Sequence, residues 1–267
     1  MLSNTSRLLT YLNAFLYTVL GAILFVLPEQ MAPVFAWKVT AFMTMTIGGW
    51  CLGNAWLAWI SARRWEWRRV YTALLYLWLF GILESWVLIS FRAKIQLAHP
   101  IAWLYLVTLG VNALTALVGL ADWFRIRPSH EPYAERVTWW MKGAVVVFVL
   151  LVGYLGLYGV VAQLDWPATH GEIFPEVMSL FTLRSFGYFY TCLALAAVPL
   201  IWERSQRVLL NHAVSAYGLI IFITFAAFVF IRLFDFAAQP GGLLYFGAYL
   251  IVGVPLLFVF AMYRKML

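Results

Sequence analysis

The chain has 267 residues, of which 64% are hydrophobic, 18% aromatic and only 11% charged. Soluble domains carry about 25% charged residues, so this composition and a mean hydropathy of +0.87 predict an integral membrane protein and exclude an ordinary soluble domain. The formal net charge is +7, but the Lys and Arg residues gather in short connectors. That placement is typical of headgroup contact and helix orientation, and nucleic-acid binding is not expected.

Eight apolar stretches are long enough to cross a bilayer as helices, since a hydrocarbon core of about 30 Å needs about 20 residues. In chain order they cover residues 8–27, 39–60, 70–91, 101–124, 137–161, 177–202, 209–230 and 243–263. No signal-peptide cleavage pattern follows the first stretch, and we expect it to be a retained span. Exposed strands are excluded, because lipid would leave their edges without hydrogen bonds. The sequence therefore predicts an all-α integral membrane protein with eight transmembrane helices.

The connectors between these stretches alternate in positive charge. One set holds thirteen basic residues, which are Arg7, Arg63, Arg64, Arg68, Arg69, Arg125, Arg127, Arg136, Lys142, Arg204, Arg207, Arg264 and Lys265. The other set holds four, which are Lys38, Arg92, Lys94 and Arg232. Because basic connectors stay on the cytoplasmic side, we predict a multi-pass protein of the cell inner membrane with both termini in the cytoplasm.

The two halves of the chain show internal similarity. A shift of 138 residues places Gly21 on Gly159, Gly49 on Gly187 and Arg69 on Arg207. We predict a first four-helix repeat at residues 1–124, a cytoplasmic linker at 125–136 and a second four-helix repeat at 137–267. An even number of spans per repeat gives both repeats the same orientation, as tandem units related by an axis along the membrane normal.

Glycines at helical spacing predict close helix contacts. Gly49 and Gly53 lie four residues apart in the second span, and Gly153, Gly156 and Gly159 lie along the fifth. Small residues at such spacing let neighbouring backbones approach. Packing within the chain is the simpler interpretation, and contact between two copies of the chain is the alternative.

Two short segments resemble a known family. The stretches "MTMTIGGWC" in the first half and "FTLRSFGYF" in the second follow an apolar hairpin and begin a helix. With this four-helix layout, each half resembles small four-span bacterial membrane proteins of the DoxX-like kind. Thr46 stands where the second half has Arg184, a departure from the motif. The resemblance implies the four-helix architecture and assigns no chemistry.

Ionisable residues deep in a span are candidates for function, because lipid makes them costly. Glu84 and Arg184 lie well inside the third and sixth predicted spans. Each is seven residues from the predicted outer end of its span, which is about 10 Å at 1.5 Å per residue. We predict that they form an ion pair across the repeat interface. The alternatives are a structural lock and a polar outer-leaflet pocket that also includes Thr46 and Tyr188.

Other site chemistry has little support in the sequence. The four histidines, His99, His130, His170 and His212, show no ligand spacing, and Cys51 and Cys192 belong to no metal or disulfide motif. A metal site in the outer connectors and a haem site near His212 are the weaker alternatives. No phosphate-binding loop, nucleophile elbow or zinc-protease motif occurs. We expect no cofactor, no metal and no catalytic residue.

Three functional hypotheses remain open. The preferred one is a non-catalytic membrane protein, either an accessory or assembly subunit or a binder of a lipid-like ligand in an outer-leaflet polar pocket between the repeats. The second is a secondary transporter with a Glu/Arg site between the two halves. The third is an intramembrane enzyme, which would need a second acid, base or metal beside Glu84. Membrane lipids are the expected partners, with protein subunits or a second copy of the chain as further possibilities.

Overall fold

The computed structural model describes residues 1–128, 136–163, 173 and 176–263. Most of the predicted linker at 125–136 and most of the acidic connector before residue 176 lie outside these ranges. The described part of the chain is all-helical apart from one isolated backbone bridge between Arg136 and Ser205. The prediction of an all-α architecture is confirmed.

Long helices form most of the molecule. They are α1 (Asn4–Val26), α3 (Ala41–Arg64), α4 (Trp67–Ser90), α5 (Pro100–Ile126), α6 (Trp139–Val161), α7 (Leu180–Trp202), α8 (Gln206–Val229) and α9 (Gly241–Met262). Short turns lie between them, namely α2 (Pro28–Met31), η1 (Ala32–Val34), η2 (Arg92–Lys94) and η4 (Ile231–Leu233). The sequence did not predict these turns.

Seven of the described helices, all the long ones except α3, are long and apolar enough to cross a membrane. The helix α3 corresponds to the predicted span 39–60. It carries Arg63 and Arg64 in its last turn, and 18 of its 24 residues are buried. Because protein rather than lipid surrounds most of α3, polar residues such as Thr46 and Asn54 are tolerated along it. The chain is thus a multi-pass α-helical membrane protein.

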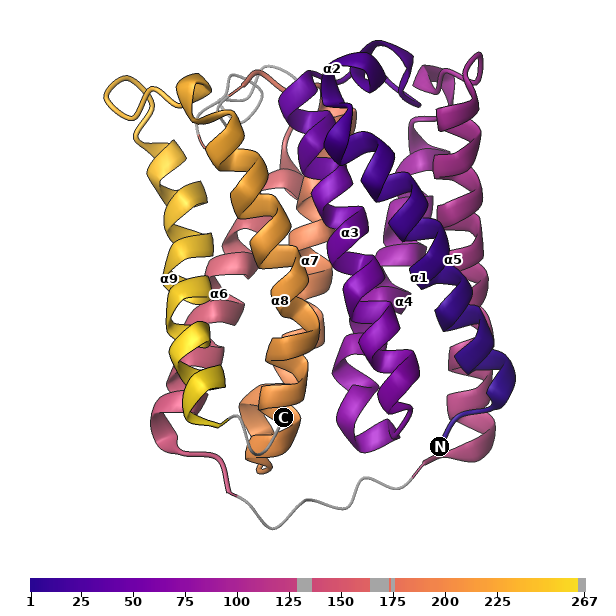
Figure 1. The fold of residues 1–267 in the computed structure, drawn as a ribbon, viewed down its shortest axis with the longest axis vertical. Helices are drawn as coiled ribbons and strands as arrows, with labels where there is room; N and C mark the ends of the chain where they lie inside the picture. Colours follow the sequence, from indigo (N-terminus) through magenta and orange to yellow (C-terminus); the bar gives the residue numbers. More distant parts are fainter. Residues whose placement is uncertain (129–135, 164–172, 174–175, 264–267) are drawn as a thin grey trace.

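Two groups of four long helices stand side by side (Figure 1). In the first, α1 packs on α3 and α5, and α4 packs on α5. In the second, α6 packs on α7, and α8 on α9. The helices α3, α4, α7 and α8 form the contact between the groups, with α3 against α8 and α4 against α7. The start of α1 and the end of α9 lie at the same end of the bundle (Figure 1), which we call the terminal end.

Hydroxyl side chains cap the starts of α3 and α7. The Thr40 side chain accepts a hydrogen bond from Met43 N, and the Ser179 side chain accepts one from Thr182 N. Such caps satisfy backbone donors that have no partner within the helix. The caps fix where α3 and α7 start and therefore the depth of every side chain along them.

Glycines permit the closest helix contacts, as the sequence predicted. A Cβ atom on Gly159 would lie 2.6 Å from the Cα atom of Gly187, and one on Gly156 would lie 2.8 Å from Thr191 N. A Cβ atom on Gly53 would lie 2.7 Å from the Cα atom of Leu219. These glycines therefore serve packing of α6 on α7 and of α3 on α8, within one chain.

An aromatic stack joins the two groups of helices. The rings of Trp50 on α3 and Phe189 on α7 have centroids 4.5 Å apart and planes 7° apart. The ring of Phe186 lies edge-on to the same indole at 4.4 Å. Offset aromatic pairs add to the free energy of burial, so this cluster helps to hold the groups together.

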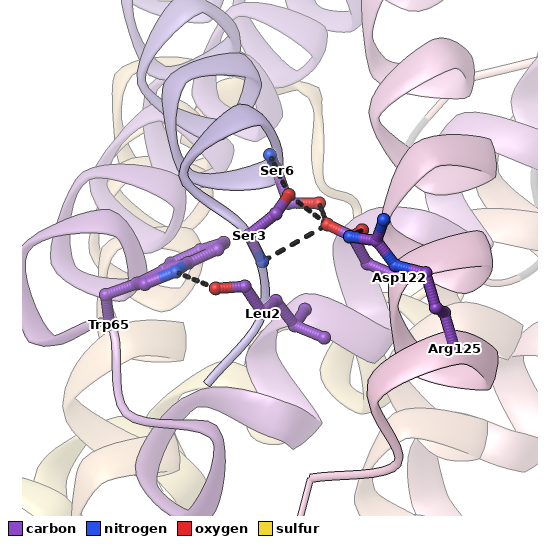
Figure 2. A network of polar contacts seen from close by, with 6 residues as sticks. All are labelled: Leu2, Ser3, Ser6, Trp65, Asp122 and Arg125. Atoms are coloured by element: carbon purple, nitrogen blue, oxygen red, sulfur yellow. Dashed lines mark hydrogen bonds and ion pairs between the residues drawn. The ribbon is translucent and has the colours of Figure 1, made fainter.

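The N-terminal segment is fastened to α5 (Figure 2). Asp122 Oδ2 accepts hydrogen bonds from Ser3 N at 3.2 Å, from Ser6 Oγ at 2.5 Å and from the Ser3 hydroxyl. Asp122 Oδ1 forms an ion pair with Arg125 Nη2 at 3.1 Å, and Leu2 O accepts from Trp65 Nε1 at 3.2 Å. The network ties the chain start to α5 and to the end of α3.

Candidate functional site

The side chain of Arg184 is half-buried near the start of α7. Its Nη2 atom donates a hydrogen bond to Ala162 O at 2.7 Å. Ala162 is the C-cap residue of α6, where backbone carbonyl groups lack partners within the helix and carry partial negative charge. The guanidinium group therefore caps a helix end.

The side chain of Glu84 on α4 is fully buried. Neither carboxylate oxygen has a hydrogen-bond partner among the described residues. The hydroxyl of Ser185 on α7 lies near this carboxyl group, but their geometry does not make a hydrogen bond. Five titratable side chains lie close enough for a charge on Glu84 to oppose their ionisation; they come from four neighbouring helices and from α4 itself, and they are Tyr17, Cys51, Tyr76, Tyr105 and Cys192.

The predicted ion pair between Glu84 and Arg184 is not among the ion pairs of the described residues. Successive side chains of a helix point about 100° apart. Because the Ser185 side chain faces α4, the Arg184 side chain points away from α4 and from Glu84. The predicted depths of Glu84 and Arg184 along their helices put the two residues near one another, but the predicted direction of the Arg184 side chain was wrong.

The other two predicted site residues do not join Glu84. Thr46 on α3 is buried, and its hydroxyl donates to Phe42 O at 2.9 Å, within its own helix. Tyr188 is half-buried and packs against the aromatic core, one helical turn beyond Arg184. Among the described residues, these four side chains therefore make separate contacts.

An apolar cavity of about 270 Å³ lies among the four helices of the second group. Its walls are formed by α6 from Trp140 to Leu155, α7 from Phe189 to Leu200, α8 from Leu209 to Ile220, and α9 from Ala248 to Val259. These segments belong to the half of the bundle at the terminal end. We call this space the α6–α9 cavity.

Looser helix packing accounts for this cavity. The helix α1 packs closely on α5 in the first group, whereas α6 and α9 touch at few places in the second. Ala144, Ala213, Ala216 and Ala248 are among the lining residues. Such small side chains leave the space between the helices unfilled. The predicted pocket lay between the repeats near the outer surface, so this cavity is in a different place.

A few polar atoms reach the α6–α9 cavity. His212 lines it, and His212 Nδ1 shares a hydrogen bond with the hydroxyl of Thr72 on α4 at 2.9 Å. Tyr190 and Tyr249 also line it, and their hydroxyl groups are 2.7 Å apart in a hydrogen bond that joins α7 to α9. The remaining surface is apolar, which is typical of a site for a hydrocarbon ligand.

The sequence did not predict this cavity. The available signal was the set of alanines on facing helices, but alanine is also the best helix former and fills small contacts as readily as it lines gaps. Only the spacing between α6 and α9 decides between these outcomes, and spacing is a tertiary property.

No group of three or more His, Cys, Asp or Glu residues within the described ranges is arranged to hold a metal ion. His130 and His170 lie outside those ranges. Comparison of the chain with family models, with curated proteins and with solved structures gave no match.

Proposed function

We propose that this protein is a non-catalytic, polytopic membrane protein that binds a lipid-like ligand in the α6–α9 cavity. The observation that carries the proposal is an almost wholly apolar cavity of about 270 Å³ lined by four apolar helices. Apolar cavities of this kind stay dry and accept apolar ligands. A role as accessory or assembly subunit is compatible with this site, because α6 and α9 expose most of their surface to the surroundings.

Retention of lipid by the purified protein tests this proposal. We expect extraction in mild detergent, followed by mass spectrometry, to find a stoichiometric lipid with the wild-type chain. Ala216→Trp puts a large side chain into the cavity and should abolish retention. Ala121→Trp on α5, at an exposed position, is the matched control and should retain the lipid. Equal lipid content in all three proteins would reject the cavity as the site.

We also propose that α3 crosses the membrane as an eighth span and that the chain is a tandem duplication. Supporting observations are the equal lengths of α1 and α6, 23 residues each, and of α4 and α8, 24 residues each. The three-residue helices η2 and η4 follow α4 and α8 in the same way. The DoxX-like resemblance of each half belongs to this proposal.

The packing favours a different offset for this duplication from the predicted 138 residues. A Cβ atom on Gly48 would meet α1 at Phe25 N, 2.6 Å away, and one on Gly187 would meet α6 at Val160 N, 2.5 Å away. Gly49 instead faces α8 at Phe222. The equivalence of Gly48 and Gly187 corresponds to an offset of 139, which places Arg184 on Met45 rather than on Thr46.

The terminal end is proposed to face the cytoplasm of a cell inner membrane, on the basis of the thirteen-to-four division of basic residues given above. Single cysteines at Arg127 and Ala238, both exposed, test the orientation. An impermeant thiol reagent applied to intact cells should label the Ala238→Cys protein and spare the Arg127→Cys protein. The reverse pattern would invert the topology.

A second candidate function is proton-coupled transport, favoured by the buried carboxyl group of Glu84 at the contact between α4 and α7. A carboxyl group in this position can exchange a proton if the two helix groups move and admit water. Proton-driven uptake into liposomes that is lost in Glu84→Gln would support transport. A protein that carries no substrate and still retains lipid would favour the binding function.

A further inference from the structure

The α6–α9 cavity has the length of a lipid chain in one leaflet. Its lining on α8 extends from Leu209 to Ile220, which is about 16 Å at 1.5 Å per residue. One leaflet contributes about half of a 30 Å hydrocarbon core. A single acyl chain therefore fits along the cavity, parallel to the helices.

At one end of the cavity the lining includes two tyrosines whose hydroxyl groups are hydrogen-bonded to each other. Tyr190 and Tyr249 are at the start of the lining on α7 and α9, near the middle of the bundle, and their hydroxyl groups are hydrogen-bonded at 2.7 Å. A ligand gains little by placing its polar end there. The polar end of a bound lipid is therefore expected at the opposite, terminal end.

Exposed tryptophans mark the headgroup level at that terminal end. Trp139 at the start of α6 is 85% exposed, and Trp202 at the end of α7 is 70% exposed. Indole rings favour the interface between hydrocarbon and headgroups. The lining residues Trp140 and Met141 at the start of α6 therefore lie close to the headgroup level.

Basic residues lie close in sequence to lining residues at this end. Lys142 follows the lining residue Met141, and Arg204 is four residues beyond the lining residue Leu200. Arg136 is brought to the same place, because Val137 N donates to Arg204 O at 3.0 Å and Arg136 bridges Ser205.

Both carboxylate oxygens of the nearby acid Glu203 accept hydrogen bonds from neighbouring groups. Its Oε1 atom accepts from Arg204 N at 2.8 Å and Ser205 N at 2.9 Å, and its Oε2 atom accepts from the Tyr71 hydroxyl at 3.1 Å. Among the described residues at the start of α6 and the end of α7, the three basic residues Arg136, Lys142 and Arg204 stand against this one acid, so this end of the second helix group has an excess of positive charge. Such a surface attracts anionic headgroups.

We propose that the ligand is an anionic phospholipid, with one acyl chain in the α6–α9 cavity and its phosphate group against Lys142 and Arg204. This inference rests on the proposed lipid-binding function and adds the class of the headgroup. The positive charge at the terminal end of the second helix group and the apolar lining along the cavity together favour this ligand over a neutral lipid or a partner helix.

Competition between two lipids with identical chains tests the headgroup. The purified protein is titrated with phosphatidylglycerol and with phosphatidylcholine in mixed micelles, and lipid retention is measured by mass spectrometry. A basic residue near the surface contributes about a fivefold preference for anionic lipid. The preference of the double variant Lys142→Gln/Arg204→Gln for phosphatidylglycerol should therefore fall about 25-fold, while its retention of phosphatidylcholine should not change.

Matched variants separate the two proposals. Arg63→Gln/Arg127→Gln removes the same charge at the terminal end of the first helix group, where both side chains are exposed, and should leave the preference unchanged. Two results would overturn the anionic headgroup and leave the cavity as a lipid site. One is equal retention of both lipids by the wild-type protein. The other is a loss of preference in this control as large as the loss in Lys142→Gln/Arg204→Gln. Retention that Ala216→Trp does not reduce would overturn the proposed function itself.

Discussion

The carboxyl group of Glu84 on α4 lies near the hydroxyl of Ser185 on α7, while the neighbouring Arg184 side chain points to Ala162 O at the end of α6. The two groups of helices therefore meet at a buried acid for which the described residues provide no hydrogen bond. A buried polar group of this kind costs free energy of folding unless it is paired. Its presence at the helix-group contact is the strongest sign of function in the first half of the chain.

Removal of this carboxyl group should stabilise the protein. Glu84→Met keeps the length of the side chain and removes the polar atoms without a partner, so we expect a gain of about 1–3 kcal/mol in the free energy of unfolding. Thermal unfolding in detergent measures the change. Glu203→Met is the control, because Glu203 accepts three hydrogen bonds at 2.8–3.1 Å, and it should destabilise. Equal losses in both variants would mean that Glu84 has a partner in the native protein.

The position of Arg184 illustrates what a sequence can predict for a membrane helix. Hydropathy and chain direction gave helix bounds within about five residues of those observed, and with them the depth of each charge. They did not give the direction of a side chain around the helix axis, where an error of one residue is about 100°. Arg184 and Ser185 differ by that amount, and Ser185 faces Glu84.

The α6–α9 cavity was beyond prediction for a related reason. Each lining helix is apolar on nearly every side, so the sequence contains no pattern that separates a face toward lipid from a face toward a cavity. The close contacts were easier to predict, because Gly156, Gly159 and Gly187 mark where backbones meet. A close contact between helices requires small residues, which the sequence shows. The gap between α6 and α9 requires no particular residue size, so the sequence does not show it.

Substitution of Gly187 should separate α6 from α7. A Cβ atom there would lie 2.5 Å from Val160 N and 2.6 Å from Gly159 C, which are backbone atoms that cannot move independently. We expect Gly187→Ala to cost about 1–3 kcal/mol in the free energy of unfolding through overpacking. Gly110→Ala on α5 is the control, because nothing lies within 4 Å of its Cβ position. Since alanine favours helix, this control should be neutral or stabilising in the same thermal assay.

Loss of the Asp122 carboxylate should release the N-terminal segment. Asp122→Asn leaves one acceptor oxygen for Ser3 and Ser6 and puts an amide donor where a second acceptor was, so a local cost of about 1–3 kcal/mol is expected. Hydrogen exchange of the first seven residues should accelerate by one to two orders of magnitude. Asp235→Asn removes the same charge from the exposed turn after η4 and should not change exchange at the N-terminus. Unchanged exchange in Asp122→Asn would show that the contacts of Leu2 and Trp65 are sufficient to hold the segment.

Arg184 and Glu84 should behave as independent sites. Arg184→Gln loses a charged hydrogen bond to Ala162 O and should cost about 1.5–3 kcal/mol in the free energy of unfolding. Because the two side chains share no hydrogen-bond partner among the described residues, a double-mutant cycle with Glu84→Gln should give a coupling free energy below about 0.5 kcal/mol.

The Tyr71–Glu203 pair provides the positive control for that cycle. The Tyr71 hydroxyl donates to Glu203 Oε2 at 3.1 Å, so Tyr71→Phe combined with Glu203→Gln should show a coupling above about 0.5 kcal/mol. A coupling between Glu84 and Arg184 as large as that of the control would restore the ion pair that the sequence predicted. It would then place Arg184 at the contact between α4 and α7, since a guanidinium group that remains on Ala162 O gives Glu84 no partner.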